Sequence, residues 1–218
     1  MNSAIILAGG TGSRLGTEYP KQFLPINNNQ IILDLSINVF KKNPNIHEII
    51  LVCHNDWLEK IENKFDNIII VPGGRSRSDS SLSGLLKCNK NCKNVLIHDA
   101  ARPYLKQQLI NDCLKYLNKY DAAIPVIKCN DSLVKIENNK TKYLNRNQIR
   151  LIQTPQAFKY EKILYALKNK KDNYSDDLST LLDSDDDIKY ILFDGDINNF
   201  KITTNYELKL AKAISNEI

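Results

Sequence analysis

The chain has 218 residues, of which 42% are hydrophobic and 25% charged, and its formal net charge is +5. This composition is typical of a soluble globular domain; the apolar runs are far shorter than the roughly 20 residues of a membrane span, and the basic residues form no concentrated nucleic-acid-binding patch. The apolar start at 3–8 is too short for a secretion signal and the five cysteines form no zinc-site pattern, so we expect a cytoplasmic protein with reduced thiols.

Short apolar segments with strand character alternate with segments of helical periodicity over the first 127 residues. We predict strands at 3–8, 48–53, 67–74, 94–103 (the last ending in a loop) and 121–127, and helices at 31–42, 56–65, 78–88 and 107–117. Continuous apolar strands separated by helices favour a parallel sheet covered on both faces. The carboxyl ends of its strands would then share one edge, where ligands bind.

This alternation breaks between 128 and 153, where two β-like stretches flank the polar turn "ENNKT". We expect a projecting hairpin arm there, which either reaches a second subunit or is a plain surface hairpin. Beyond it we predict helices near 160–170 and 176–183, a strand at 188–193 and a last helix at 206–214. The whole of 1–218 is expected to form a single domain with this arm at about 128–153.

The segment "LAGGTGSRLGTEYPKQFLPI" (7–26) follows the first predicted strand, which is where phosphate-binding loops occur. Its glycines at 10, 12 and 16 match neither the dinucleotide fingerprint nor the P-loop pattern. The loop carries Arg14 and Lys21, which could fold over a polyphosphate. The alternative is a glycine-rich turn with two surface cations.

Two further motifs supply partners for this loop. In "GGRSRSDSS" (73–81), Arg77 and Ser80 lie near a predicted helix start, where free N–H groups and a basic side chain could bind an anion. The alternative is an ordinary strand-to-helix turn. In "HDAARP" (98–103), Asp99 is a candidate Mg²⁺ ligand at a strand end and Arg102 a candidate anion ligand. The alternative role for the aspartate is to cap a turn. His98 is expected to be structural.

The last motif is "NNFKITT" (198–204), in which Lys201 is expected on a short strand, as a cation at the reacting phosphate. Together the four motifs indicate a nucleotidyltransferase that binds a nucleoside triphosphate and Mg²⁺. A phosphate monoester is already largely anionic at neutral pH and needs no general base to act as the nucleophile. Catalysis would then consist of positioning and of charge stabilisation at the α-phosphate as pyrophosphate leaves.

Six motifs occur in an order and spacing that resemble one enzyme family. "LAGGTGSRLG…PKQFL", "GGRSRSDS", "HDAARP", "QTPQAF", "SDD" and "NNFKITT" are similar to those of the 2-C-methyl-D-erythritol 4-phosphate cytidylyltransferases of the non-mevalonate isoprenoid pathway. The resemblance runs from about residue 3 to 214. It implies an α/β, Rossmann-like three-layer sandwich with a mostly parallel central sheet and a projecting β-hairpin arm. It also implies a homodimer clasped by this arm and Mg²⁺-dependent transfer of CMP from CTP to 2-C-methyl-D-erythritol 4-phosphate, with release of pyrophosphate.

The resemblance also implies roles for individual residues. The catalytic cations are Arg14, Lys21 and Lys201. The nucleotide is bound by Ala8, Gly9, Gly10, Thr11, Gly12, Gly74, Arg75, Arg77, Ser80, Asp99 and Ala100, with Asp99 also binding the metal. The sugar phosphate is bound by Arg102, Thr154 and Ser175, together with Asp131, Ser132 and Arg146 of the arm.

Some positions depart from the family's usual pattern. Arg75 stands where an acidic residue is frequent, Ser132 and Ser175 replace threonines, and Asn198 stands where a second acidic metal ligand has been suggested. Ile149 replaces a frequent tryptophan beside the arm arginine, which bears on the acceptor more than on the reaction. The alternatives are a D-ribitol-5-phosphate cytidylyltransferase, a non-catalytic nucleotide-binding module and a sugar-1-phosphate uridylyltransferase.

Overall fold

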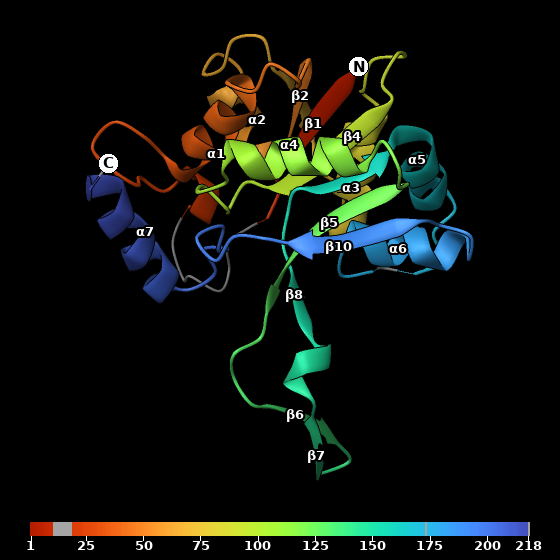
Figure 1. Cartoon of the computed structure of the whole chain (residues 1–218). Coiled ribbons are helices and arrows are strands. Elements are labelled where there is room, and N and C mark those ends of the chain that lie inside the picture. The colour runs from red at the N-terminus through yellow and green to blue at the C-terminus, as the bar shows by residue number, and fades with distance from the viewer. Residues whose placement is uncertain (11–18, 173, 218) are drawn as a thin grey trace.

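The computed structural model describes residues 1–10, 19–172 and 174–217, and its centre is one large β-sheet (Figure 1). The sheet has eight strands in the order β10-β5-β9-β4-β1-β2-β3, with β8 paired to β5. Its members are β1 (Asn2–Ala8), β2 (Glu48–Cys53), β3 (Ile69–Pro72), β4 (Asn94–Asp99), β5 (Ala122–Lys128), β8 (Arg150–Ile152), β9 (Gln156–Lys159) and β10 (Tyr190–Asp194).

Most neighbouring strands run parallel, because helices connect them. β1 pairs in parallel with both β2 and β4, β2 with β3, and β5 with β10. Ala4, Ile5 and Ile6 of β1 are fully buried, as expected for a central strand that is apolar on both faces. The carboxyl ends of β1, β3 and β4 therefore lie along one edge of the sheet.

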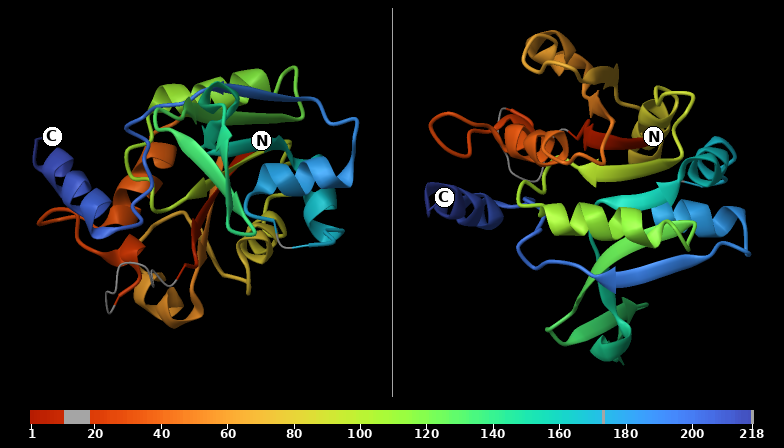
Figure 2. Two further views of the ribbon diagram at one scale, coloured as in Figure 1. Left: turned by 90° about the horizontal axis from the view of Figure 1, so that it is seen from below. Right: turned by 45° about the horizontal axis from the view of Figure 1, so that its top comes forward.

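Helices cover both faces of the sheet (Figure 2). The core on one face includes α1 (Ile32–Lys41), α2 (Leu58–Ile61) and α4 (Gln107–Tyr116). The core on the other face includes α3 (Arg77–Leu85), α5 (Tyr160–Lys168) and α6 (Asp177–Ser184). α7 (Asn205–Glu217) packs at one end against a smaller apolar cluster. Short 3-10 turns lie at Lys21–Phe23, Asn55–Trp57 and Arg146–Gln148. The fold is therefore a three-layer sandwich.

A two-stranded arm projects from the end of β5 and returns through β8 (Figure 1). It consists of β6 (Leu133–Glu137) and β7 (Lys140–Leu144), joined by Asn138 and Asn139. Both asparagines have positive φ, as a tight hairpin turn requires. The side chains of Ile136 and Tyr143 are 71% and 78% exposed. The arm therefore presents apolar surface that this chain does not cover.

The predicted α/β class, the mostly parallel sheet and the hairpin are confirmed, and several boundaries are wrong. The helix expected at 56–65 is reduced to Leu58–Ile61 after a 3-10 turn, and the strand expected at 67–74 spans only Ile69–Pro72. Lys201 lies on an irregular segment before α7 and not on a strand. β9 was not predicted; it lies antiparallel between β4 and β5. In the described parts of the chain, no helix is long and apolar enough to cross a membrane.

Candidate active site

A pocket of about 430 Å³ opens at the edge of the sheet where β1, β3 and β4 end. Four segments far apart in sequence meet there. Its lining consists of Leu7, Gly9, Gly10, Lys21, Gln22, Gly74, Arg75, Ser76, Arg77, Ser80, Asp99, Ala101, Lys201 and Thr203. The pocket thus brings together the motifs on which the sequence-based hypothesis rests.

The first glycine segment is held in place by Gln22, whose role the sequence analysis missed. Its side chain is buried, and Nε2 donates to the carbonyl oxygens of Ala8 at 2.6 Å and Gly10 at 2.9 Å. The two carbonyl groups are thereby satisfied from one side. The only sequence signal for this role is the place of Gln22 next to Lys21.

The second glycine segment lies against the first. A Cβ on Gly73 would come within 3.6 Å of the Cα of Gly9. A side chain at residue 73 would therefore occupy the space between the two glycine segments. Ser80 Oγ accepts from the backbone N of Gly74 at 3.1 Å and donates to the carbonyl of Ser76 at 3.0 Å. A Cβ on Gly74 would collide with Asp79, so this turn requires glycine. The two turns leave backbone facing the pocket.

Asp99 is the buried anion of the pocket. Lys201 Nζ lies 2.7 Å from Asp99 Oδ2, Arg77 Nε lies 3.5 Å from Oδ1, and Arg102 Nε lies 3.9 Å from Oδ2. Burial alone would raise the pKa of Asp99, but the charges of Arg77, Lys201 and Arg102 outweigh it and hold the pKa well below its usual range. Asp99 is therefore a permanent carboxylate and a poor proton acceptor.

Arg77 connects Asp99 to a second buried carboxylate. Its Nη1 donates to Asp177 Oδ2 at 2.6 Å, and Asp177 is fully buried at the start of α6. Burial would lower the pKa of Arg77, yet Asp177 and Asp99 raise it above its ordinary value. Burial raises the pKa of Asp177, with Arg77 opposing this effect. Arg77 is thus held between two aspartates, with Asp177 on one side of its guanidinium and Asp99 on the other.

His98 has the structural role that we expected. Its ring is buried between Thr154 Oγ1 and the carbonyl oxygen of Arg102, each 3.1 Å away. The carbonyl can only accept, so Nε2 carries the proton, and Nδ1 is left to accept from Thr154. Burial lowers the pKa of His98 to about 4, which keeps the ring neutral. Thr154 Oγ1 also accepts from the backbone N of Asp99 at 3.0 Å.

The predicted site residues fall into four groups. Those that line the pocket are Gly9, Gly10, Lys21, Gly74, Arg75, Arg77, Ser80, Asp99 and Lys201. Ala8 and Ala100 are buried directly beside it, so only their backbone could contact a ligand, and Arg102 and Thr154 lie behind Asp99. Thr11, Gly12 and Arg14 lie outside the described residues.

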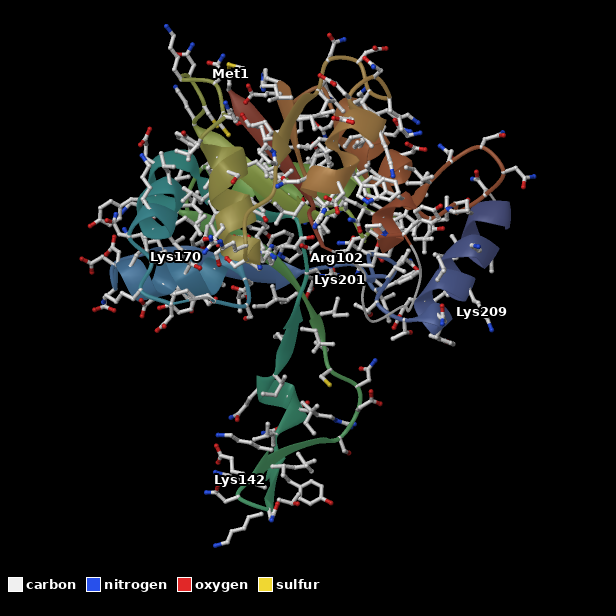
Figure 3. All side chains as sticks on the ribbon, turned by 180° about the vertical axis from the view of Figure 1, so that it is seen from behind. Met1, Arg102, Lys142, Lys170, Lys201 and Lys209 are labelled. Atoms are coloured by element: carbon white, nitrogen blue, oxygen red, sulfur yellow. The ribbon has the colours of Figure 1, made fainter. Side chains whose placement is uncertain are left out.

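The remaining predicted residues do not line this pocket. Asp131, Ser132 and Arg146 are exposed on the arm, and Ser175 is exposed ahead of α6. Figure 3 shows Arg102 and Lys201 where the arm leaves the body, and Lys142 at the far end of the arm. Within the chain as described, the acceptor-side prediction is therefore not assembled in one place.

The strand ends of this α/β fold gather two glycine turns, four cationic side chains and one permanent carboxylate, an arrangement that fits the class of nucleotidyltransferases. Comparisons with known proteins narrow this class. The family model for 2-C-methyl-D-erythritol 4-phosphate cytidylyltransferase matches residues 2–217. The chain belongs to that family.

Individual relatives agree with this assignment. The enzyme of this name from Clostridium botulinum (strain Loch Maree) is 37% identical over 98% of this chain and 96% of its own length. The enzyme of this name from Thermotoga neapolitana is 33% identical over 100% of this chain and 98% of its own length. The crystal structure of a 4-diphosphocytidyl-2C-methyl-D-erythritol synthase from Anaerococcus prevotii superposes with a TM-score of 0.86 and is 29% identical in sequence. The superposition covers 99% of this chain and 96% of that one.

Proposed function

We propose that this chain transfers CMP from CTP to 2-C-methyl-D-erythritol 4-phosphate and releases pyrophosphate, the reaction for which its family is named. The observation that supports this most directly is the pocket itself. Arg77 and Lys201 pair with the carboxylate of Asp99, and Lys21 lines the same pocket between two glycine turns. This arrangement would bind a polyanion, and the carboxylate would bind its metal ion.

The nucleotide side of the pocket consists of the glycine turns and the start of α3. Backbone groups at Gly9 and Gly74, together with Ser80, would read the base and the phosphates, because no side chain intervenes there. Arg77 is well placed to hold a phosphate, since Asp177 fixes its guanidinium from behind. Lys21 and the undescribed Arg14 would complete the triphosphate site.

The chemistry requires charge stabilisation more than proton transfer. The phosphate of the acceptor attacks the α-phosphate of CTP, and its own anionic oxygen is the nucleophile. Among the described residues that line the pocket there is no histidine or cysteine, and the low pKa of Asp99 makes it a weak base. Lys201 would therefore act as the cation that stabilises the negative charge at the α-phosphate.

The residues present fit Mg²⁺. In the described parts of the chain, no group of three or more His, Cys, Asp or Glu side chains could hold a metal. Mg²⁺ commonly takes one or two carboxylates and completes its shell with substrate phosphates and water. Asp99 is such a carboxylate, and Mg²⁺ bound there would neutralise charge on the triphosphate.

The acceptor would bind next to Asp99, on the side of Arg102. Arg102 Nη1 donates to the carbonyl of Asn199 at 2.7 Å, and its Nε lies 3.9 Å from Asp99 Oδ2. The guanidinium is thereby fixed beside Asp99, where its positive charge would attract the phosphate of the acceptor. We further propose that Thr154 and Ser175 contact the acceptor and that Asp131, Ser132 and Arg146 reach it from a second subunit, as part of a cytoplasmic homodimer.

The test is pyrophosphate release from CTP with Mg²⁺, measured in parallel with 2-C-methyl-D-erythritol 4-phosphate, D-ribitol 5-phosphate and no acceptor. We expect release only with the methylerythritol phosphate, and its loss when EDTA removes the metal. Release with ribitol phosphate alone would contradict the proposed acceptor and leave the mechanism intact. CTP binding without release in any arm would contradict the catalytic role.

A further inference from the structure

Two buried glutamines, Gln153 and Gln156, flank the turn that joins β8 to β9. They are 2% and 1% exposed, and the mechanism above assigns them no role. A buried side-chain amide requires hydrogen-bond partners. The partners of these two amides lie in two different segments of the active site.

Gln153 closes the turn that precedes Lys201. Its Nε2 donates to the carbonyl oxygens of Asp196 at 2.8 Å and Asn199 at 3.3 Å, and its Oε1 accepts from the backbone N of Asp196 at 3.1 Å. On the other side of Lys201, the backbone N of Ile202 donates to the carbonyl of Ala101 at 2.9 Å. The irregular segment that carries Lys201 is thus anchored at both ends.

Gln156 fixes the start of α6. Its Oε1 accepts from the backbone N of Asp177 at 3.1 Å and of Leu178 at 3.0 Å. These first-turn N–H groups have no acceptor within the helix. Asp177 then holds Arg77 at 2.6 Å, so the position of this arginine depends on where α6 begins.

We propose that Gln153 and Gln156 are positioning residues of the transfer reaction. Gln153 places Lys201, and Gln156 places Arg77 through Asp177. The inference rests on the proposed function, in which Lys201 acts at the reacting phosphate and Arg77 holds the nucleotide. Loss of Gln153 therefore lowers kcat, whereas loss of Gln156 raises the KM for CTP.

The two glutamines use their amides differently, and this provides a matched test. Gln153 uses both the donor and the acceptor, so Gln153→Glu would set a carboxylate against two carbonyl oxygens. Gln156 uses only its acceptor in these contacts, and a carboxylate beside helical N–H groups is favourable. The same Gln→Glu change is therefore tolerated at 156 and harmful at 153.

The experiment measures kcat, KM for CTP and calorimetric CTP affinity for the Met and Glu variants at both positions. We expect Gln153→Met and Gln153→Glu to lower kcat about tenfold or more while KM for CTP stays within about twofold. Gln156→Met should weaken CTP binding about tenfold, and Gln156→Glu should recover most of it. Gln108→Met and Gln108→Glu, on the exposed side of α4, are the matched controls.

A second pair of variants covers the case in which a Met variant does not fold. A Cβ on Gly195 would collide with Gln153 Oε1, so Gly195→Ala displaces the same amide from outside and should reproduce the loss of kcat. Asp177→Asn removes the charge that holds Arg77 and should reproduce the loss of CTP affinity.

Folded variants with unchanged kcat and CTP affinity would overturn the inference, and so would variants in which both glutamines change the same constant. Inactivity of the parent protein with every acceptor is a separate outcome, which contradicts the proposed function. In that case CTP affinity still tests Gln156. The rate at which an amine-acylating reagent modifies Lys201 then tests Gln153, because a displaced Lys201 leaves Asp99 and reacts faster; an unchanged rate overturns the inference.

Discussion

At the scale of single residues, the charge of the pocket is centred on Asp99 and Lys201. We expect Lys201→Ala to lower kcat about 100-fold or more, since removing one group that stabilises transition-state charge has an effect of this size. Asp99 keeps Arg77 and Arg102 as partners in the variant, so the fold should survive. Steady-state kinetics measure the change, with exposed Lys189→Ala as the control. A kcat near the parent value would remove Lys201 from the mechanism.

His98 makes stability depend on pH. An unfolded histidine takes up a proton as the pH falls below about 6.5, whereas burial holds the pKa of folded His98 near 4. Between these values the unfolded state binds more protons, so the free energy of unfolding falls as the pH falls, by up to roughly 3 kcal/mol. Above this window the ring is neutral in both states and contributes no pH dependence.

Urea unfolding at about pH 7 and about pH 5 measures this effect. At the higher pH the His98→Gln variant should be less stable than the parent protein. Its free energy of unfolding should nevertheless fall less than that of the parent between the higher and the lower pH. Asp99 hardly contributes between these two pH values, because its stabilising effect is lost only as the pH falls through about 4, where an unfolded aspartate takes up its proton, and further below. An equal loss in both proteins would mean that other groups cause the pH dependence.

At the scale of elements, α3 comes unusually close to the sheet at Gly84. A Cβ there would lie 2.6 Å from Ile5 Cγ2 and 3.0 Å from Val52 Cγ2. We expect Gly84→Ala to reduce the free energy of unfolding by about 1–3 kcal/mol through overpacking, although alanine is the better helix former. Thermal unfolding measures it, and the neighbouring Ser83→Ala, which is partly exposed, is the control. A Gly84→Ala protein at least as stable as the parent would show that α3 can shift.

The elements that the sequence predicted are those with strong local patterns. β1, β2 and β4 are continuous apolar runs, and α1 and α4 have helical periodicity, so their existence follows from the sequence. β9 is only four residues long and follows a proline turn, and its pairing with β4 and β5 depends on contacts far away in the chain. Lys201 sits among β-branched residues, which suggested a strand, but its segment finds no strand to pair with. Strand pairing that depends on residues far away in the chain leaves no pattern in the local sequence.

The same division holds for the site. Gly9, Lys21, Arg77 and Asp99 could be predicted because their motifs follow strands whose ends meet at one edge. Gln22, Asp177 and the two positioning glutamines could not, because their partners are backbone groups or charges on other elements. Their roles appear only when the distances are known.

At the scale of the whole molecule, the arm is the feature that favours binding to a second copy of the chain. Val134 and Tyr143 are opposite each other in β6 and β7, and with Ile136 they form an exposed apolar face. We expect this face to be covered in a homodimer, and Ile136→Asp to shift sedimentation from dimer to monomer. Lys142→Asp places the same charge on the other face of the hairpin and should remain dimeric. A parent protein that sediments as a monomer at high concentration would contradict the dimer.

The position of β9 also sets the order in which the molecule is completed during synthesis. β4 and β5 follow one another in the chain, yet β9, which emerges from the ribosome only after the arm, lies between them. Until it arrives, a nascent chain has two unpaired strand edges in the middle of its future sheet, which are open to wrong pairing. Both glycine turns have been made by then, but the lysine that completes the pocket has not. The growing chain thus acquires the backbone of the proposed nucleotide site early and the proposed catalytic charge late.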